Sequence, residues 1–233
     1  MSFIIKHKPI TFNDVVISDK NVCLQLRNWL ATKSQEPLIL YGPSGTGKSS
    51  IAKLLPYAMY ADFDAFDLQW IIADGRNNLA GQLNDLKAFC GVNSLSFSNN
   101  RFVVIDEIDN LKPEVQRNLK GYIDQYSGVV HFVFTTNFLN KIDKAIQSRC
   151  RKMKISHSNM SAWLPRLKHI MKLEGYANIA TDAELLNIAS KANGDCRSAL
   201  RKIEDLVVSL EGANIRKSYI TSAPSSSRTM HSK

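Results

Sequence analysis

The chain has few cysteines, and they lack the spacings that would suggest a disulfide framework or a metal site. Its 233 residues include four of them, Cys23, Cys90, Cys150 and Cys196, and no two form a CxxC pair. Isolated cysteines are typical of proteins in a reducing compartment. The histidines show no metal-ligand spacing and no protease-like triad is evident. We therefore expect reduced thiols, with Cys23 and Cys90 buried as small apolar residues, and no zinc site.

Long hydrophobic runs are also missing. No apolar stretch approaches the roughly 18 residues expected of a membrane-spanning helix. The first residues, MSFIIKHKPITF, place a short apolar patch before the charges, which is not the order found in a secretory signal peptide. We therefore expect a cytoplasmic protein with no membrane partner, in the host cytoplasm if the protein is viral.

Acidic residues are absent from the last stretch of the chain. Residues 213–233 contain four basic residues and no acidic one, and so supply four of the nine net positive charges. The stretch is rich in serine and lacks apolar periodicity, which predicts a disordered tail. The net charge of +9 favours polyanionic partners such as nucleic acid.

Short apolar runs alternate with helical patterns over residues 1–156. This alternation predicts an α/β domain in which a parallel sheet is buried between helices. The expected strands lie within residues 37–41, 66–73, 101–107, 129–137 and 150–156. From 157 to 212 the apolar runs give way to three amphipathic stretches, which predict a small all-α domain. Gly212 is the expected stop of its last helix.

The stretch GPSGTGKS follows the first predicted strand and precedes a predicted helix. It fits the pattern G-x-x-x-x-G-K-[ST], in which glycines let backbone N–H groups surround phosphates and the helix N-terminus adds positive charge. Lys48 would reach the β- and γ-phosphates, and Ser49 would hold Mg²⁺. The stretch therefore predicts an ATP site formed by Gly42, Ser44, Gly45, Thr46, Gly47, Lys48, Ser49 and Ser50.

A second motif, VVIDEID, is an apolar strand that ends in acidic residues. Asp106 is the expected carboxylate on the Mg²⁺ side of the site. Glu107, beside it, can orient and deprotonate an attacking water, which would make the site a hydrolase. Asp109 is expected to begin a helix rather than to take part in the chemistry.

Further stretches then resemble one family: HKPITFNDVV, ADGRNNLAGQL, TTN, QSRC and GDCRSAL. From about residue 6 to 210 the chain resembles the ATPase subunits of sliding-clamp loaders, a branch of the AAA+ ATPases. Within them it is most similar to the small subunit of T-even-type bacteriophage loaders. The resemblance implies an AAA+ P-loop NTPase fold, with a parallel sheet flanked by helices and a three-helix lid domain.

The resemblance assigns roles to residues outside the two motifs. Pro9, Val15 and Val16 match the segment that borders the adenine. Asn137 matches the first sensor, a polar group near the γ-phosphate and the attacking water. Arg197 matches the second sensor, a lid arginine that reaches the phosphates of its own subunit.

Arg149 matches the arginine finger of the family, which enters the ATP site of a neighbouring subunit. A finger of this kind accelerates hydrolysis on the order of 10³ to 10⁵-fold. The resemblance therefore implies other loader subunits in a ring or spiral, and hydrolysis that depends on their assembly. The neighbouring Arg151 has no such match and is expected to be a solvated strand residue.

The resemblance also implies primer-template DNA and a sliding clamp as partners. Gln116 matches a residue that links the magnesium-side motif to DNA contact. Arg76, Lys112 and Arg117 lie in the region expected to follow the phosphate backbone, with little readout of bases. Each of these three also fits an ordinary solvated surface charge.

One departure from the family is that its members usually continue into a C-terminal helical collar. Here the chain ends about twenty residues after the predicted lid, so we expect a short form, a truncated chain or one that relies on a partner. In addition, His-Lys replaces the usual Tyr-Arg before Pro9.

Two alternative functions stay open beside the clamp loader. The first is an AAA+ helicase loader or replication initiator, which Ser-Arg-Cys and the sensor pattern disfavour. The second is a nucleotide-dependent assembly module with little hydrolysis, against which Glu107, Asn137 and Arg149 argue.

Overall fold

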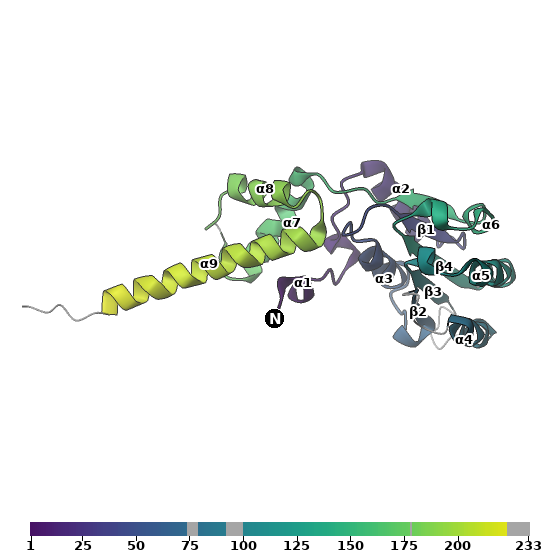
Figure 1. Ribbon diagram of the computed structural model, residues 1–233. Helices are drawn as coiled ribbons and strands as arrows, with labels where there is room; N and C mark the ends of the chain where they lie inside the picture. The colour runs from purple at the N-terminus through teal and green to yellow at the C-terminus, as the bar shows by residue number, and fades with distance from the viewer. Residues whose placement is uncertain (74–78, 92–99, 178, 223–233) are drawn as a thin grey trace, which may run out of the picture.

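The computed structural model describes residues 1–73, 79–91, 100–177 and 179–222. A parallel sheet with helices on both faces forms one unit, and a group of helices forms a second unit beside it (Figure 1). This arrangement confirms the predicted α/β fold followed by a small helical domain. Among the described residues, no helix is long and apolar enough to cross a membrane.

The sheet has five parallel strands in the order β2-β3-β4-β1-β5. Because the strands are parallel, the carboxyl ends of the neighbouring strands β3, β4 and β1 meet at one edge of the sheet. In sheets of this kind that edge carries the ligand site. The strands are β1 (Leu38–Tyr41), β2 (Leu68–Ile72), β3 (Arg101–Asp106), β4 (Val130–Thr136) and β5 (Arg151–Lys154).

Helices cover both faces of the sheet (Figure 1). The first face packs against α2 (Lys20–Ala31) and α3 (Lys48–Met59), and the second against α4 (Leu79–Gly91), α5 (Pro113–Tyr126) and α6 (Lys144–Gln147). Short 3₁₀ turns connect several elements: η1 (Phe12–Asp14), η2 (Ala65–Asp67), η3 (Ile108–Asn110) and η4 (Leu139–Lys141). The core therefore lies in two layers, one on each side of the strands.

The sequence analysis does not identify helix α2, although its signals are present. Asp19 caps it by accepting hydrogen bonds from the next backbone N–H groups. Val22, Leu26 and Trp29 recur at helical spacing and are buried against the sheet. Cys23 lies beside this apolar stripe and is only partly buried, so the prediction that it is buried is wrong. Cys90 is buried as predicted.

The helical unit contains α7 (Met160–Leu173), α8 (Asp182–Lys191) and α9 (Cys196–Ser222). Thr181 and Glu184 form the predicted capping box at the start of α8. The predicted stop at Gly212 is wrong, since α9 continues through it to Ser222. A glycine inside a helix costs only about 1 kcal/mol relative to alanine, so it does not by itself end one. The prediction of a disordered tail from residue 213 is therefore wrong for residues 213–222, and residues 223–233 lie outside the described part of the chain.

The beginning of the chain packs on the helical unit rather than on the sheet. Helix α1 (Phe3–Lys6) places Phe3 in the same apolar cluster as Trp163. Lys6 and His7 both contact Glu174 at 2.6 Å. The first residues of the predicted 1–156 domain are therefore held by the helices that follow it, and the chain then crosses to the sheet.

Candidate active site

The loop between β1 and α3 folds around the ammonium group of Lys48. This group donates to Gly42 O at 2.9 Å, to Pro43 O at 2.6 Å and to Asn137 Oδ1 at 2.8 Å. All three N–H donors of the lysine therefore have acceptors. Burial lowers the pKa of Lys48, against the opposing effect of the Asp106 carboxylate. A phosphate group at this position would offer the lysine stronger, anionic acceptors.

The glycines of the loop are required by its conformation. Gly42, Gly45 and Gly47 have φ angles of 144°, 74° and 90°, a region that favours glycine. A Cβ on Gly42 would lie 2.1 Å from the backbone oxygen of Ile155, and one on Gly45 would lie 1.8 Å from Asp195 Oδ2. The loop is thus held between the end of the sheet and the start of α9.

The two predicted magnesium-side residues meet where β3 ends. Ser49 Oγ donates to Asp106 Oδ1 at 2.8 Å, and Thr135 Oγ1 donates to the same carboxylate oxygen. Hydroxyl and carboxylate oxygens are the hard ligands that Mg²⁺ prefers, so the pair fits that ion. Thr135, from the neighbouring strand β4, orients the carboxylate. The sequence analysis does not identify Thr135, because its place beside Asp106 comes from strand pairing.

Glu107 follows directly and has an unusual backbone. It is in the left-handed region (φ 59°, ψ 43°), where a non-glycine residue is strained and is often found at functional sites. Its N–H donates to Thr135 Oγ1 at 3.1 Å, and its Oε2 accepts from Asn110 Nδ2 at 3.1 Å. This turn places the side chain on the wall of the cavity next to Asp106.

A side-chain hydrogen bond also holds the backbone on either side of Asn137, at the end of β4. Thr136 Oγ1 donates to Asp109 Oδ1 at 2.6 Å and accepts the N–H of Phe138 at 2.9 Å. Asp109 lies in the short turn η3, which agrees with its predicted place at the start of a helix. The carboxyl ends of β3 and β4 are thereby linked by side chains as well as by the sheet.

A cavity of about 760 Å³ lies above this edge of the sheet. This volume is within the range of small-molecule sites. Apart from Gly42, every residue predicted to hold the nucleotide lines it: Pro9, Val15, Val16, Ser44, Gly45, Thr46, Gly47, Lys48, Ser49, Ser50 and Arg197. Asp106, Glu107 and Asn137 line it as well. The sequence analysis does not identify an apolar part of the wall formed by Ile4, Ile5, Tyr57, Leu68, Trp70 and Trp163.

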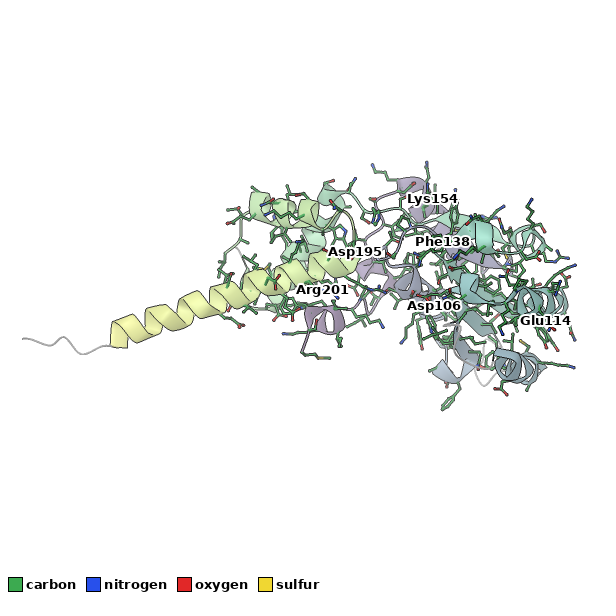
Figure 2. The ribbon with its side chains drawn as sticks, viewed as in Figure 1. Asp106, Glu114, Phe138, Lys154, Asp195 and Arg201 are labelled. Carbon is green, nitrogen blue, oxygen red and sulfur yellow. The ribbon has the colours of Figure 1, made fainter. Side chains whose placement is uncertain are left out.

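The start of α9 closes one side of the cavity. The N–H of Cys196 donates to Gly45 O at 2.8 Å, so the helical unit contacts the phosphate loop directly. Asp195 Oδ1 accepts the N–H of Ser198 at 2.7 Å, and Figure 2 shows Asp195 where the two units meet. Burial raises the pKa of the Cys196 thiol to about 12, so this thiol is neutral. Arg197, the next residue, lines the cavity.

Three residues of the QSRC stretch hold its backbone in place. Gln147 Nε2 donates to the carbonyl oxygens of Leu139, at 2.9 Å, and of Ile142, at 2.8 Å. Ser148 Oγ donates to the backbone oxygen of the preceding helix at 3.0 Å. Cys150 is buried in the core. The stretch therefore reaches the surface at Ser148, which is exposed, and at Arg149, which is half-buried.

Arg149 does not line the cavity of its own chain. Its Nε and Nη2 donate to the two carboxylate oxygens of Asp124 on α5, and its Nη1 donates to Ala145 O at 2.8 Å. Arg151, by contrast, points to solvent and pairs with Glu36 at 2.7 Å across the sheet edge. The structure thus separates Arg149 from the residues that would bind nucleotide in the same chain.

Gln116 is buried at the base of α5 and joins it to the segment after β4. Its Nε2 donates to Leu111 O at 3.2 Å and to Lys141 O at 3.3 Å, and its Oε1 accepts the N–H of Asp143 at 2.7 Å. Its side chain therefore connects the loop after β3 with the loop after β4. This position is compatible with the coupling role implied by the resemblance.

The residues expected to contact DNA are less closely grouped. Lys112 caps the start of α5 and Arg117 lies on the same helix, and both are exposed. Arg76 lies outside the described residues. The structure places Lys112 just before α5 and Arg117 within it, and their role in binding stays a prediction.

Comparison with known proteins gives a family, two relatives and a fold. Residues 38–157 match the model of the ATPase family associated with various cellular activities (AAA). Replication factor C small subunit 1 of Pyrobaculum arsenaticum is 28% identical over 202 residues, which are 85% of this chain and 60% of that protein. Replication factor C subunit 3 of Schizosaccharomyces pombe is 26% identical over 199 residues, covering 85% and 57%.

Among solved structures, RuvB of Thermotoga maritima superposes with a TM-score of 0.68 at 16% identity, covering 88% of this chain and 67% of that one. At this identity the likeness shows the fold alone. The chain spans about 60% of the length of the replication factor C relatives.

Proposed function

The chain belongs to the AAA family of ATPases, and we propose that it is an ATP-hydrolysing subunit of a sliding-clamp loader that acts in DNA replication. One observation carries the proposal. Apart from Gly42, the residues proposed to bind nucleotide and to activate water line one cavity, whereas Arg149 of the Ser-Arg-Cys stretch does not line it and is partly exposed. If Arg149 is the finger, as the resemblance implies, a neighbouring subunit must supply it to this cavity. The names of the relatives, replication factor C subunits, support a role in replication.

In the proposed site, Lys48 would exchange its bonds to backbone oxygens and Asn137 for the β- and γ-phosphates of ATP. Ser49 and Asp106 would hold Mg²⁺, which neutralises charge on the phosphates when it is bound. The exchange frees the Asn137 amide to contact the γ-phosphate or the attacking water. Arg197 would reach the phosphates from α9.

Glu107 is the proposed general base. Its carboxylate lies beside Asp106 on the cavity wall and is restrained by Asn110. From this position it would orient a water in line with the γ-phosphate and accept a proton as the water attacks. The left-handed backbone conformation at Glu107 occurs where the chain leaves β3, and the residue lines the cavity.

The proposed partners are other loader subunits, a sliding clamp and primer-template DNA. Subunits in a ring or spiral would place Arg149 of one chain at the γ-phosphate of the next, where it stabilises the transition-state charge. DNA would be held through its phosphate backbone by cations such as Lys112, Arg117 and Arg76. Binding of this kind should weaken steeply as the salt concentration rises.

Two narrower points belong to the proposal. We place the chain with the small subunit of T-even-type bacteriophage loaders on the motifs that carry that resemblance. We also expect it to work in the cytoplasm, and in that of the host if the protein is viral.

The test is ATP turnover by the wild-type chain and by Glu107→Gln, with and without primed DNA and candidate clamps. We expect primed DNA plus clamp to stimulate wild-type turnover. Glu107→Gln should still bind ATP but lose on the order of 10²- to 10⁴-fold in turnover. Glu114→Gln is the matched control, because this exposed carboxylate lies on α5, away from Asp106 (Figure 2), and it should behave as wild type.

Two outcomes would contradict the proposal. Low turnover that ignores Glu107 would support the assembly module. Stimulation by a replicative helicase, with no response to any clamp, would support the helicase loader or initiator.

A further inference from the structure

We propose that Asp124 is the positioning residue of the arginine finger: its carboxylate holds the Arg149 guanidinium in the orientation that enters a neighbouring subunit's ATP site. This inference rests on the proposed function of Arg149. It adds a residue to which the sequence motifs assign no role, on helix α5 and 25 positions earlier in the chain than Arg149.

The contact is a two-point fork. Nε of Arg149 lies 2.5 Å from Asp124 Oδ1, and Nη2 lies 3.0 Å from Oδ2. Nη1 donates to Ala145 O at 2.8 Å. Because a guanidinium has five N–H donors in one rigid plane, three fixed bonds determine the orientation of that plane. Two donors remain for another acceptor.

The backbone on both sides of Arg149 is already fixed. Ile146 and Cys150 are buried, and the side chain of Gln147 is bonded to two loop carbonyls. The remaining freedom is in the long side chain of the arginine, which has several rotatable bonds. Asp124 and Ala145 O restrict this freedom, and a group held near its reactive position before the encounter lowers the entropic cost of catalysis.

The charges around Asp124 leave a surplus of positive charge for a phosphate. The hydrogen bond from Arg149 lowers the pKa of Asp124, and Lys120, one turn earlier on α5, lowers it as well. The Asp124 carboxylate therefore lies near two cations, Arg149 and Lys120, and the three side chains together keep a net charge of +1. The pair is also at the surface, with 31% of the Arg149 side chain and 49% of the Asp124 side chain exposed. In the proposed arrangement, a neighbour's phosphate would contact the two remaining donors while the fork stays intact.

The test compares Asp124→Asn with Arg149→Ala and with Glu114→Gln, an exposed acid on the same helix. Asparagine keeps the shape of Asp124 but has one acceptor oxygen instead of two. We expect Asp124→Asn to lower the kcat for ATP on the order of 10- to 100-fold and to leave KM unchanged, because its own ATP site is intact. Glu114→Gln should match wild type.

Mixing subunits separates positioning from a general structural defect. Lys48→Ala cannot bind ATP properly but carries an intact Asp124 and Arg149. Adding it to Asp124→Asn should restore turnover, because the wild-type finger then enters the ATP site of the Asp124→Asn chain. A folding defect in α5 would stay with the ATP-binding chain and would not be rescued. Failure of this rescue would overturn the inference. A higher turnover rate in Asp124→Asn alone would overturn it as well, because it would mean that Asp124 restrains the finger.

The outcomes also distinguish this inference from the proposed function. If Arg149→Ala hydrolyses ATP as fast as wild type, the trans finger itself is wrong. If Arg149→Ala is inactive and Asp124→Asn is fully active, only the role of Asp124 is wrong.

A measurement that needs no assembly follows the Arg149 Nε–H by NMR, with its signal assigned by Arg149→Lys. We expect slow exchange with water in the wild type and fast exchange in Asp124→Asn. Wild-type exchange as fast as that of the exposed Arg117 would also overturn the inference.

Discussion

Acidification should destabilise the protein through one buried histidine, His131 in β4. Its ring is 1% exposed and stacks on Phe102 with the centroids 4.5 Å apart, while Trp29 contacts it edge-on at 5.9 Å. Its Nε2 bonds to the Tyr60 hydroxyl at 3.1 Å and its Nδ1 lies 3.0 Å from Ser34 O. The carbonyl requires Nδ1 to carry the proton, so the neutral ring satisfies both contacts.

The size of the effect follows from the two pKa values. Burial lowers the pKa of His131 from 6.5 to about 4 in the folded protein, whereas the unfolded chain keeps a value of about 6.5. Between these values the unfolded state binds a proton that the folded state does not, so the stability falls as the pH falls. A difference of about 2.5 pKa units at 1.36 kcal/mol each gives a loss of about 3 kcal/mol by pH 4.

The assay is urea unfolding between pH 7.5 and pH 4, followed by the fluorescence of Trp29. Trp70 and Trp163 are replaced by phenylalanine in both proteins, which differ only in having His131 or His131→Phe. The variant leaves Tyr60 and Ser34 without a ring nitrogen, which should cost roughly 1–3 kcal/mol at pH 7.5. Its stability should then fall less on acidification than that of the wild type, by about 3 kcal/mol. Parallel pH profiles for the two proteins would refute the reasoning.

Two further predictions concern the site and its support. Gly42→Ala should lower the free energy of unfolding by at least about 1–3 kcal/mol and weaken ATP binding, because its Cβ would lie 2.1 Å from Ile155 O at a φ of 144°. Gly121→Ala on α5, where nothing lies within 4 Å of the added Cβ, should instead raise the free energy of unfolding by about 0.5–1 kcal/mol. Urea unfolding measures the stability of both variants, and titration with a fluorescent ATP analogue measures their ATP binding. Equal effects of the two substitutions would count against the argument. Gln116→Leu should lower the free energy of unfolding by about 1–3 kcal/mol for each group left unpaired, such as the Asp143 N–H. Unchanged urea unfolding would contradict the role of Gln116 in connecting the loops after β3 and β4.

The fold could be predicted wherever a local pattern determines an element. Helix α5 begins and ends where the sequence pattern places it, since Pro113 suits a first helical turn and the apolar positions follow at helical spacing. The strands and the phosphate loop were identified for the same reason. Helix α2 is absent from the sequence predictions although its cap and apolar stripe are ordinary, and Gly212 does not end α9 as predicted.

The location of the candidate site could be predicted where a motif brings its own polar residues, as with Lys48 and Asp106, which line one cavity. What the sequence analysis does not identify depends on segments that meet only in three dimensions. Thr135 reaches Asp106 because β3 and β4 are paired. Phe3 joins the helical unit, and Asp124 meets Arg149, across long stretches of chain. No spacing rule connects such pairs.

The most direct test of the central claim is the steady-state ATPase rate against protein concentration, for wild type and Arg149→Ala, with primed DNA and a clamp present. A finger that acts in trans predicts that wild-type activity per chain rises with concentration. It also predicts that Arg149→Ala is slower on the order of 10³-fold or more. Activity that is independent of concentration, and equal in the two proteins, would contradict the account.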